Sequence, residues 1–274
     1  MNFELDGISY RLKEPEDFSW LSVYGRCFKI YDQLTSGNIC FCMDGPYGKL
    51  FIKYAGARTV NCGDRPRDAV QTLRKAIPFY QEKRKGLVQL LNHGPINKGY
   101  ALIFRYQEGE ILHNQETLNH LHHLPLYNRL SMLDTLFNLQ AELEEYGLFP
   151  VDFSDENILI DFENAAAVQC DIDQYTTLPC VNESGRMPGI FKYLAPEEYE
   201  KGAKMSGATA VYRLGILALE FFCSSFREPE TWTASEPLYQ VAMKAVNEEP
   251  MRRYPSVAAF LKAWREAVGK SRSR

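Results

Sequence analysis

Three polar residues in one stretch of the chain have a spacing suited to phosphoryl transfer. Asp152 precedes Asn157 by five positions, and Asp171 follows Asn157 by fourteen, beyond the apolar run Ile158-Leu159-Ile160. In this chemistry one carboxylate orients a hydroxyl nucleophile, while an asparagine and a second aspartate hold Mg²⁺ against nucleotide phosphates. The spacing therefore predicts a catalytic group of Asp152, Asn157 and Asp171, with Asn157 and Asp171 as the metal ligands.

The composition narrows the possible classes of protein. The 274 residues are 45% hydrophobic, which is enough for one large domain or two lobes. A net charge of −4 gives no electrostatic case for nucleic acid or an anionic membrane as a partner. The seven scattered cysteines contain no CxxC pair, and no apolar run reaches the roughly 18 residues of a membrane span. We expect a cytoplasmic protein with reduced thiols, since the acidic N-terminus is not typical of a signal peptide.

The first hundred residues predict an antiparallel sheet with one helix. The residues before 21 suggest an edge strand, and β-branched and aromatic residues mark the strands that follow. Apolar spacing predicts a helix over 65–85 that Pro78 should kink or end. The five expected strands of the sheet cover residues 28–34, 39–43, 49–54, 87–91 and 100–104.

A turn in this sheet is a candidate phosphate-binding loop. Ser36, Gly37 and Asn38 lie between two expected strands, and Gly37 is sixteen residues before Lys53. A glycine there would let backbone N–H groups approach phosphate oxygens, and Lys53 would reach the same phosphates. A plain hairpin turn and a solvent-facing lysine remain alternatives. Asp68 and Glu82 are the acidic residues nearest the expected helix, and the sequence selects neither as the partner of Lys53.

The remainder of the chain is predicted to be mainly helical. A polar connector at 105–109 divides it from the sheet, and an amphipathic helix over 127–146 should end at Gly147. The apolar segment 214–223 is typical of a buried helix. His113, His120, His122 and His123 lack a completing carboxylate or cysteine at ligand spacing, so we interpret them as solvated surface residues rather than a metal site.

The order of these elements resembles the eukaryotic-type serine/threonine protein kinases. The resemblance is carried by Asp152 to Asn157, Asp171-Ile172-Asp173, Ala195-Pro196-Glu197 and Val211 to Gly215. It implies an α+β, bilobal protein-kinase-like fold. Residues 1–105 would form an N-lobe with an antiparallel five-stranded sheet and one helix, and residues 106–274 a mainly α-helical C-lobe.

The resemblance also implies cofactors and further site residues. ATP and Mg²⁺ would be bound, and the γ-phosphate would pass to a hydroxyl of a protein substrate. Glu197 would pair with Arg253 as a structural contact. The residues that would bind the nucleotide are Lys53, Ser36, Gly37, Asn38, Phe104, Tyr106 and Leu159.

Four departures from the kinase pattern bear on activity. Pro150-Val151 stands where the family has His-Arg, so a phosphate on Thr176 or Thr177 has no obvious cationic partner. Ser154 stands where a lysine usually lies near the γ-phosphate. Ile172-Asp173 replaces Phe-Gly. Ala210 replaces an aspartate that braces the catalytic loop, so that support must come from elsewhere.

These departures leave two alternatives to a protein kinase. One is a pseudokinase that acts as a nucleotide-dependent binding module, which the single glycine in the turn at 36–38 and the absence of a lysine at position 154 favour. The other is a small-molecule kinase of the aminoglycoside or choline type, since those enzymes also lack the catalytic-loop lysine. Ala195-Pro196-Glu197 favours a protein substrate instead.

Overall fold

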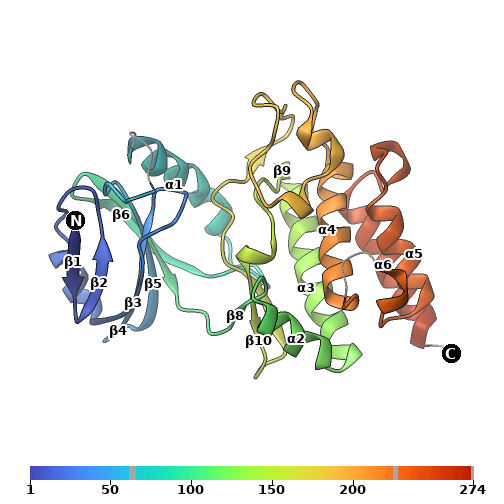
Figure 1. Cartoon of the computed structure of the whole chain (residues 1–274), viewed down its shortest axis with the longest axis horizontal. Coiled ribbons are helices and arrows are strands. Elements are labelled where there is room, and N and C mark those ends of the chain that lie inside the picture. Colours follow the sequence, from blue (N-terminus) through green and yellow to red (C-terminus); the bar gives the residue numbers. More distant parts are fainter. Residues whose placement is uncertain (62–65, 225–227, 273–274) are drawn as a thin grey trace. The chain divides into compact units, whose positions relative to one another are not determined.

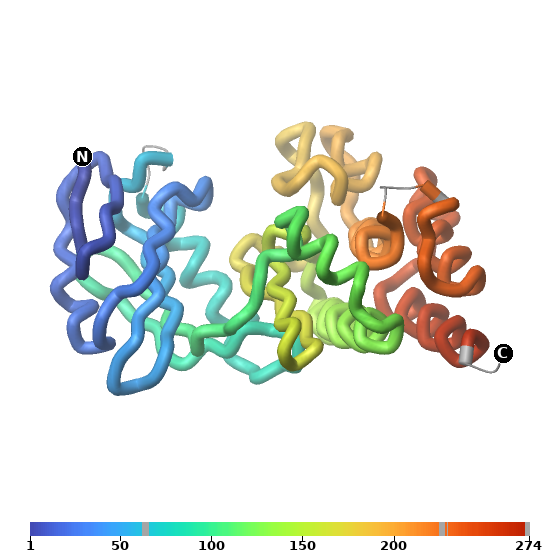
Figure 2. The backbone as a smooth tube through the Cα atoms, turned by 60° about the horizontal axis from the view of Figure 1, so that its bottom comes forward, coloured from blue at the N-terminus to red at the C-terminus, as the bar shows by residue number. Residues whose placement is uncertain are grey.

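The computed structural model describes residues 1–61, 66–224 and 228–272, and the chain folds into two compact units (Figures 1 and 2). The first unit comprises Met1–Lys83 and Val88–Gln107, and the second comprises Arg84–Leu87 and Glu108–Arg274. Arg65, where the first helix was expected to begin, lies outside the described residues. Helices and antiparallel sheets are both present, so the α+β class is confirmed.

The first unit contains a five-stranded antiparallel sheet in the order β3-β4-β5-β7-β6. Side chains of a strand alternate between the two faces of its sheet, so Leu50, Ile52 and Tyr54 share one buried face while Phe51 and Lys53 share the other. The strands are β3 (Arg26–Tyr31), β4 (Ile39–Gly45), β5 (Gly48–Ala55), β6 (Leu90–Ile96) and β7 (Gly99–Arg105).

The N-terminal residues form a hairpin instead of the expected edge strand. β1 (Asn2–Leu5) pairs with β2 (Ile8–Arg11) in a sheet of its own, and a 3₁₀ helix, Ser19–Tyr24, follows. Phe18 is buried against Phe41 and Tyr54, with ring centroids 4.9 and 5.7 Å away. Tyr10 of β2 belongs to the same buried hydrophobic cluster, so the hairpin packs on the sheet through its side chains instead of joining it as a strand.

Two further elements of this unit, a strand and a helix, have other bounds than those predicted. The fourth strand was expected at 87–91, but β6 begins at Leu90 and includes Pro95, which an edge strand tolerates. Leu87 instead belongs to the second unit, where it forms a parallel bridge with Gln169. The helix α1 (Pro66–Tyr80) continues two residues past Pro78 and ends before the expected residue 85.

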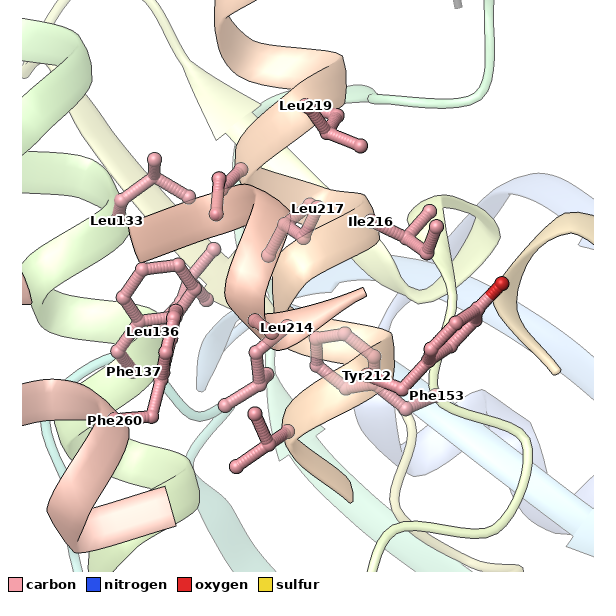
Figure 3. Close-up of a cluster of buried hydrophobic side chains, with 14 of the residues drawn as sticks. Leu133, Leu136, Phe137, Phe153, Tyr212, Leu214, Ile216, Leu217, Leu219 and Phe260 are labelled. Carbon is pink, nitrogen blue, oxygen red and sulfur yellow. The ribbon is translucent and has the colours of Figure 1, made fainter. Parts of the chain in front are cut away.

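The second unit is built around α4 (Gly207–Phe222), almost all of which is buried. Figures 1 and 2 show α3 (Leu126–Glu145) beside α4, with α5 (Glu236–Ala245) and α6 (Val257–Arg272) packed on the same group. Side chains from these helices form a core that also contains Phe153 (Figure 3). The helix α2 (Gln115–His123) precedes α3. None of the helices in the described ranges has the length and apolar character of a bilayer span.

Short strands join this helical core to the loops of the second unit. β10 (Ile158–Asp161) lies between β8 (Glu110–Ile111) and β11 (Ala166–Gln169) in an antiparallel sheet. β9 (Leu148–Phe149) pairs with β12 (Thr176–Thr177). These pairings fix the ends of the segment from residue 150 to residue 157.

The expected end of the long helix is confirmed at Gly147. Its φ is 73°, and its N–H donates to the carbonyl oxygen of Glu144 at 2.8 Å. An alanine in this left-handed conformation is strained, so Gly147→Ala should lower the free energy of unfolding by about 1 kcal/mol. Urea denaturation would measure the loss.

Gly269→Ala is the matched control for that measurement. Gly269 is exposed near the end of α6, and an added Cβ would meet no described atom within 4 Å. Alanine is the better helix former, so this substitution should leave stability unchanged or raise it by up to about 1 kcal/mol. Equal losses in the two variants would contradict the explanation from backbone conformation.

Candidate active site

The segment that contains Asp152 is strained and anchored. Asp152 has a φ of 62°, a left-handed conformation that is uncommon for a residue other than glycine. Its neighbour Phe153 is fully buried in the core of the second unit. The amide Nδ2 of Asn157 donates to the backbone oxygen of Asp152 at 2.9 Å and closes the loop. Asp152 and Asn157 are half-buried, whereas the residues from Phe153 to Asp155 are buried.

The β10–β11 hairpin brings Asp171 to the same end as Asn157. Ile158 pairs with Gln169, so the residues just outside this pair lie opposite one another. The N–H of Cys170 accordingly donates to the carbonyl oxygen of Asn157 at 2.9 Å. Asp171 follows directly and is half-buried, and its Oδ1 accepts the N–H of Asp173 at 2.9 Å. The structure thus links Asp152 to Asn157, and Asn157 to the residue before Asp171.

Three buried side chains form a closed ring of hydrogen bonds that contacts the backbone of Asp171. Gln140 donates to Gln169 at 2.6 Å, Gln169 donates to the Tyr175 hydroxyl at 2.8 Å, and Tyr175 donates back to Gln140 at 3.0 Å. Gln169 Nε2 also lies 3.2 Å from the carbonyl oxygen of Asp171, as a donor. Burial raises the pKa of Tyr175, so its hydroxyl stays protonated. No motif in the sequence predicts this ring, because Gln140 lies 29 positions before Gln169.

A cluster of charged groups contacts the same loop at Asp155. Lys192 Nζ is 2.7 Å from Asp155 Oδ2 and also forms an ion pair with Glu220, while the Tyr193 hydroxyl donates to Glu220. Burial raises the pKa of Glu220 to about 7, and the Asp155 carboxylate adds to the shift. His113 Nδ1 lies 3.0 Å from Asp155. Lys192 therefore fastens the segment before Ala195 to the loop that contains Asp152.

The expectation that all four histidines are solvated was wrong for one of them. His122 is half-buried, and its Nε2 lies 2.7 Å from the backbone oxygen of Glu220. Burial lowers the pKa of His122. His113, His120 and His123 are exposed. In the described parts of the chain, no three His, Cys, Asp or Glu side chains form a group that would hold a metal ion.

The ion pair expected between Glu197 and Arg253 is present. Arg253 binds the carboxylate with both terminal nitrogens, at 2.7 and 3.0 Å, and its side chain is fully buried. The guanidinium also donates to the backbone oxygens of Asn247, Glu248 and Ala208. One arginine thereby ties the segment after Pro196 to the start of α4 and to the loop before α6.

The expected nucleotide-binding residues divide between the two units. In the first unit, Lys53 is buried on β5 and shares a face with Phe51, which pairs with Phe104 on β7. The ring of Tyr106 packs edge-on against Phe28 with centroids 5.4 Å apart. In the second unit, Leu159 is half-exposed on β10, opposite in direction to Ile158 and Ile160.

The expected phosphate turn has the backbone of a tight turn. Gly37 has a φ of 79°, and its N–H donates to the Leu34 carbonyl oxygen at 3.3 Å. The N–H of Asn38 lies 3.5 Å from Ser36 Oγ. Asn38 is buried, and its Oδ1 has no hydrogen-bond partner among the residues that the structure describes. Asp68 is exposed on α1, whereas Lys53 is buried.

Comparison with known proteins adds no family to this geometry: no protein-family model matches the chain, and a search of curated proteins returns no match.

Proposed function

We propose that the protein is an ATP- and Mg²⁺-dependent phosphotransferase that resembles a serine/threonine protein kinase and acts on a protein hydroxyl. The observation that carries the proposal is the linkage of Asp152, Asn157 and Asp171 through the Asn157 amide and the β10–β11 hairpin. All three are half-buried polar residues, and Asn157 and Asp171 flank the β10–β11 hairpin at its open end. Such a group has a chemical use that a plain polar turn lacks.

The donor chemistry of these residues suits Mg²⁺. Asn157 and Asp171 present amide and carboxylate oxygens, which are the hard ligands that Mg²⁺ takes alongside nucleotide phosphates. The amide nitrogen of Asn157 is engaged by the Asp152 backbone, which orients the side chain. A bound Mg²⁺ would neutralise charge on the phosphates. Asp152 would orient the substrate hydroxyl and accept its proton.

Within the α+β class, we propose that the fold is a bilobal, protein-kinase-like one. A five-stranded antiparallel sheet with α1 in one unit, and a helical bundle with the Asp152 loop in the other, support it. The anchored Ala195-Pro196-Glu197 segment supports a protein as the substrate. The residues that we propose bind the nucleotide are Lys53, Ser36, Gly37, Asn38, Phe104, Tyr106 and Leu159.

A nucleotide-dependent binding module without transfer is the second candidate. Ser154 stands where a protein kinase has a lysine, and it is buried. Within the described chain its hydroxyl has no hydrogen-bond partner. This position supplies no cation to a developing phosphoryl charge, which would weaken transition-state stabilisation without preventing nucleotide binding.

Transfer of label from γ-labelled ATP separates the two candidates. The full-length protein would be incubated with Mg²⁺ and a generic protein substrate, beside Asp152→Asn and the exposed control Glu163→Gln. We expect transfer by the wild type and by Glu163→Gln, and background labelling by Asp152→Asn, which has lost its proton acceptor.

Other outcomes of this experiment would favour a binding module, a different proton acceptor or a small-molecule substrate. Mg²⁺-dependent thermal stabilisation by ATP without any transfer would favour the binding module. Equal labelling by the wild type and Asp152→Asn would remove the role assigned to Asp152. Label on an added aminoglycoside or choline, with none on protein, would assign a small-molecule substrate.

A further inference from the structure

Arg213 is a fully buried arginine in the apolar helix α4. Neither Arg213 nor its carboxylate partner Glu198 has any exposed side-chain surface. Arg213 lies three positions after Ala210, so the two residues lie on the same side of the helix, about one turn apart. Ala210 stands where the kinase pattern has an aspartate that braces the catalytic loop. A charged side chain is thus present one turn away from the missing brace.

The guanidinium of Arg213 contacts the loop directly. Its Nη1 donates to the backbone oxygen of Phe153 at 3.2 Å. Phe153 follows Asp152, whose left-handed backbone is strained and persists only where its surroundings hold it. The ring of Phe149, just before this loop, lies 5.9 Å from the guanidinium carbon. Arg213 therefore supports the loop at the residue next to Asp152.

The partner of Arg213 is fixed at several points. Nη2 of Arg213 donates to Glu198 Oε1, and Glu198 Oε2 accepts the N–H of Ala195 at 2.9 Å. The backbone oxygen of Glu198 accepts from the Asn182 side chain and from the Met187 N–H, each at 2.9 Å. Glu198 thus connects Arg213 to both ends of the segment from residue 182 to residue 198.

The same segment passes close to Asp152. A Cβ added at Gly189 would lie 3.5 Å from Arg213 Nη1 and 3.6 Å from the Cα of Asp152. Gly189 has a φ of 131°, which side-chain-bearing residues rarely adopt. The segment backbone, the guanidinium and the Asp152 loop therefore meet at one point.

We propose that Arg213, held by Glu198, is the positioning residue that fixes the Asp152 loop in place of an aspartate at position 210. The proposal rests on the function proposed above, in which Asp152 is the proton acceptor. A buried ion pair is often no more stabilising than an apolar replacement, so its presence here fits a role in fixing one conformation. The pair also couples the loop to the segment from residue 182 to residue 198.

The test uses the full-length protein in three forms besides the wild type. Arg213→Lys keeps the charge but loses the planar fork that reaches both Phe153 and Glu198. Arg213→Met combined with Glu198→Gln removes both charges, and the new amide oxygen can still accept the Ala195 N–H. Arg265→Lys is the control, because Arg265 forms a comparable two-nitrogen contact with Asp134 on the exposed surface.

Each form would be measured by hydrogen exchange of the peptide covering 150–158, by melting temperature, and by kcat and KM for ATP. We expect at least tenfold faster exchange in both Arg213 variants, and a fall of at least tenfold in kcat with KM for ATP changed less than threefold. The double variant should melt close to the wild type because no unpaired buried charge remains. Arg265→Lys should change none of these quantities.

Two results would overturn the inference. One is wild-type exchange at 150–158 in a double variant that melts like the wild type. The other is an unchanged kcat in Arg213→Lys when the wild type transfers phosphate. Faster exchange in both variants, in a wild-type protein that transfers nothing, would uphold the positioning role and reject the proposed function instead.

Discussion

Replacing Lys192 with methionine should lower the free energy of unfolding by about 2–3 kcal/mol at pH 8. Lys192 is the cation between Asp155 and Glu220, whose side chains are only 4% and 5% exposed. Removing one partner from a buried pair leaves charge uncompensated, which typically costs about 3–5 kcal/mol, and the 32% exposure of Lys192 moderates the loss. Urea denaturation of the variant beside the wild type would measure it.

The loss should also depend on pH. The pKa of Glu220 is raised by burial to about 7 in the folded protein, above its ordinary value of 4.5, and the Lys192 charge opposes this shift. A carboxyl group whose pKa is higher in the folded protein than in the unfolded protein contributes to stability at low pH. That contribution is lost as the pH rises from the unfolded pKa to the folded pKa. Without Lys192 the folded pKa of Glu220 rises further. The cost of Lys192→Met should therefore be greater at pH 8.5 than at pH 6.

The surrounding groups define the controls for this prediction. Asp155 and Tyr193 face Glu220 together with Lys192, and His113 reaches Asp155 from the segment before α2. Adding Glu220→Gln to Lys192→Met removes the titrating carboxylate, so stability should recover in part and the extra loss at pH 8.5 should disappear. A loss that is independent of pH in Lys192→Met would show that Glu220 does not carry the effect.

The elements that sequence predicted well are those with a strong local pattern. The helix over 127–146 became α3 because its apolar residues recur at helical spacing and Gly147 ends it. β4 and β5 were located by dense apolar residues joined by a glycine-containing turn. β6 was misplaced because an edge strand needs no continuous apolar run, and its exposed residues carry little pattern.

The spacing of Asp152, Asn157 and Asp171 was visible in the sequence because the β10–β11 hairpin that joins them is short. The buried partners of the same loop were not, since Lys192 and Glu220 reach Asp155 across many residues. Long-range polar contacts leave no periodic pattern in a sequence. The available signal was the occurrence of charged residues inside the apolar helix α4, which implies buried partners elsewhere in the fold.

Replacing Arg253 with methionine should lower the free energy of unfolding by about 3–5 kcal/mol, which is more than we expect for Lys192→Met or Gly147→Ala. Its buried guanidinium donates five hydrogen bonds, two to Glu197 and three to backbone oxygens. Methionine would leave a nearly buried carboxylate and three carbonyl groups without these donors. Arg253→Lys should lose less, because it keeps the charge but cannot reproduce the planar fork.

Urea denaturation of Arg253→Met, Arg253→Lys and Arg265→Met would test this expectation. Arg265 makes a similar two-nitrogen contact with Asp134, but both side chains are exposed, so its loss should cost no more than about 1 kcal/mol. Combining Arg253→Met with Glu197→Gln removes the stranded charge and should restore part of the stability. Equal losses for Arg253→Met and Arg265→Met would contradict the argument, because burial is the property that distinguishes the two ion pairs.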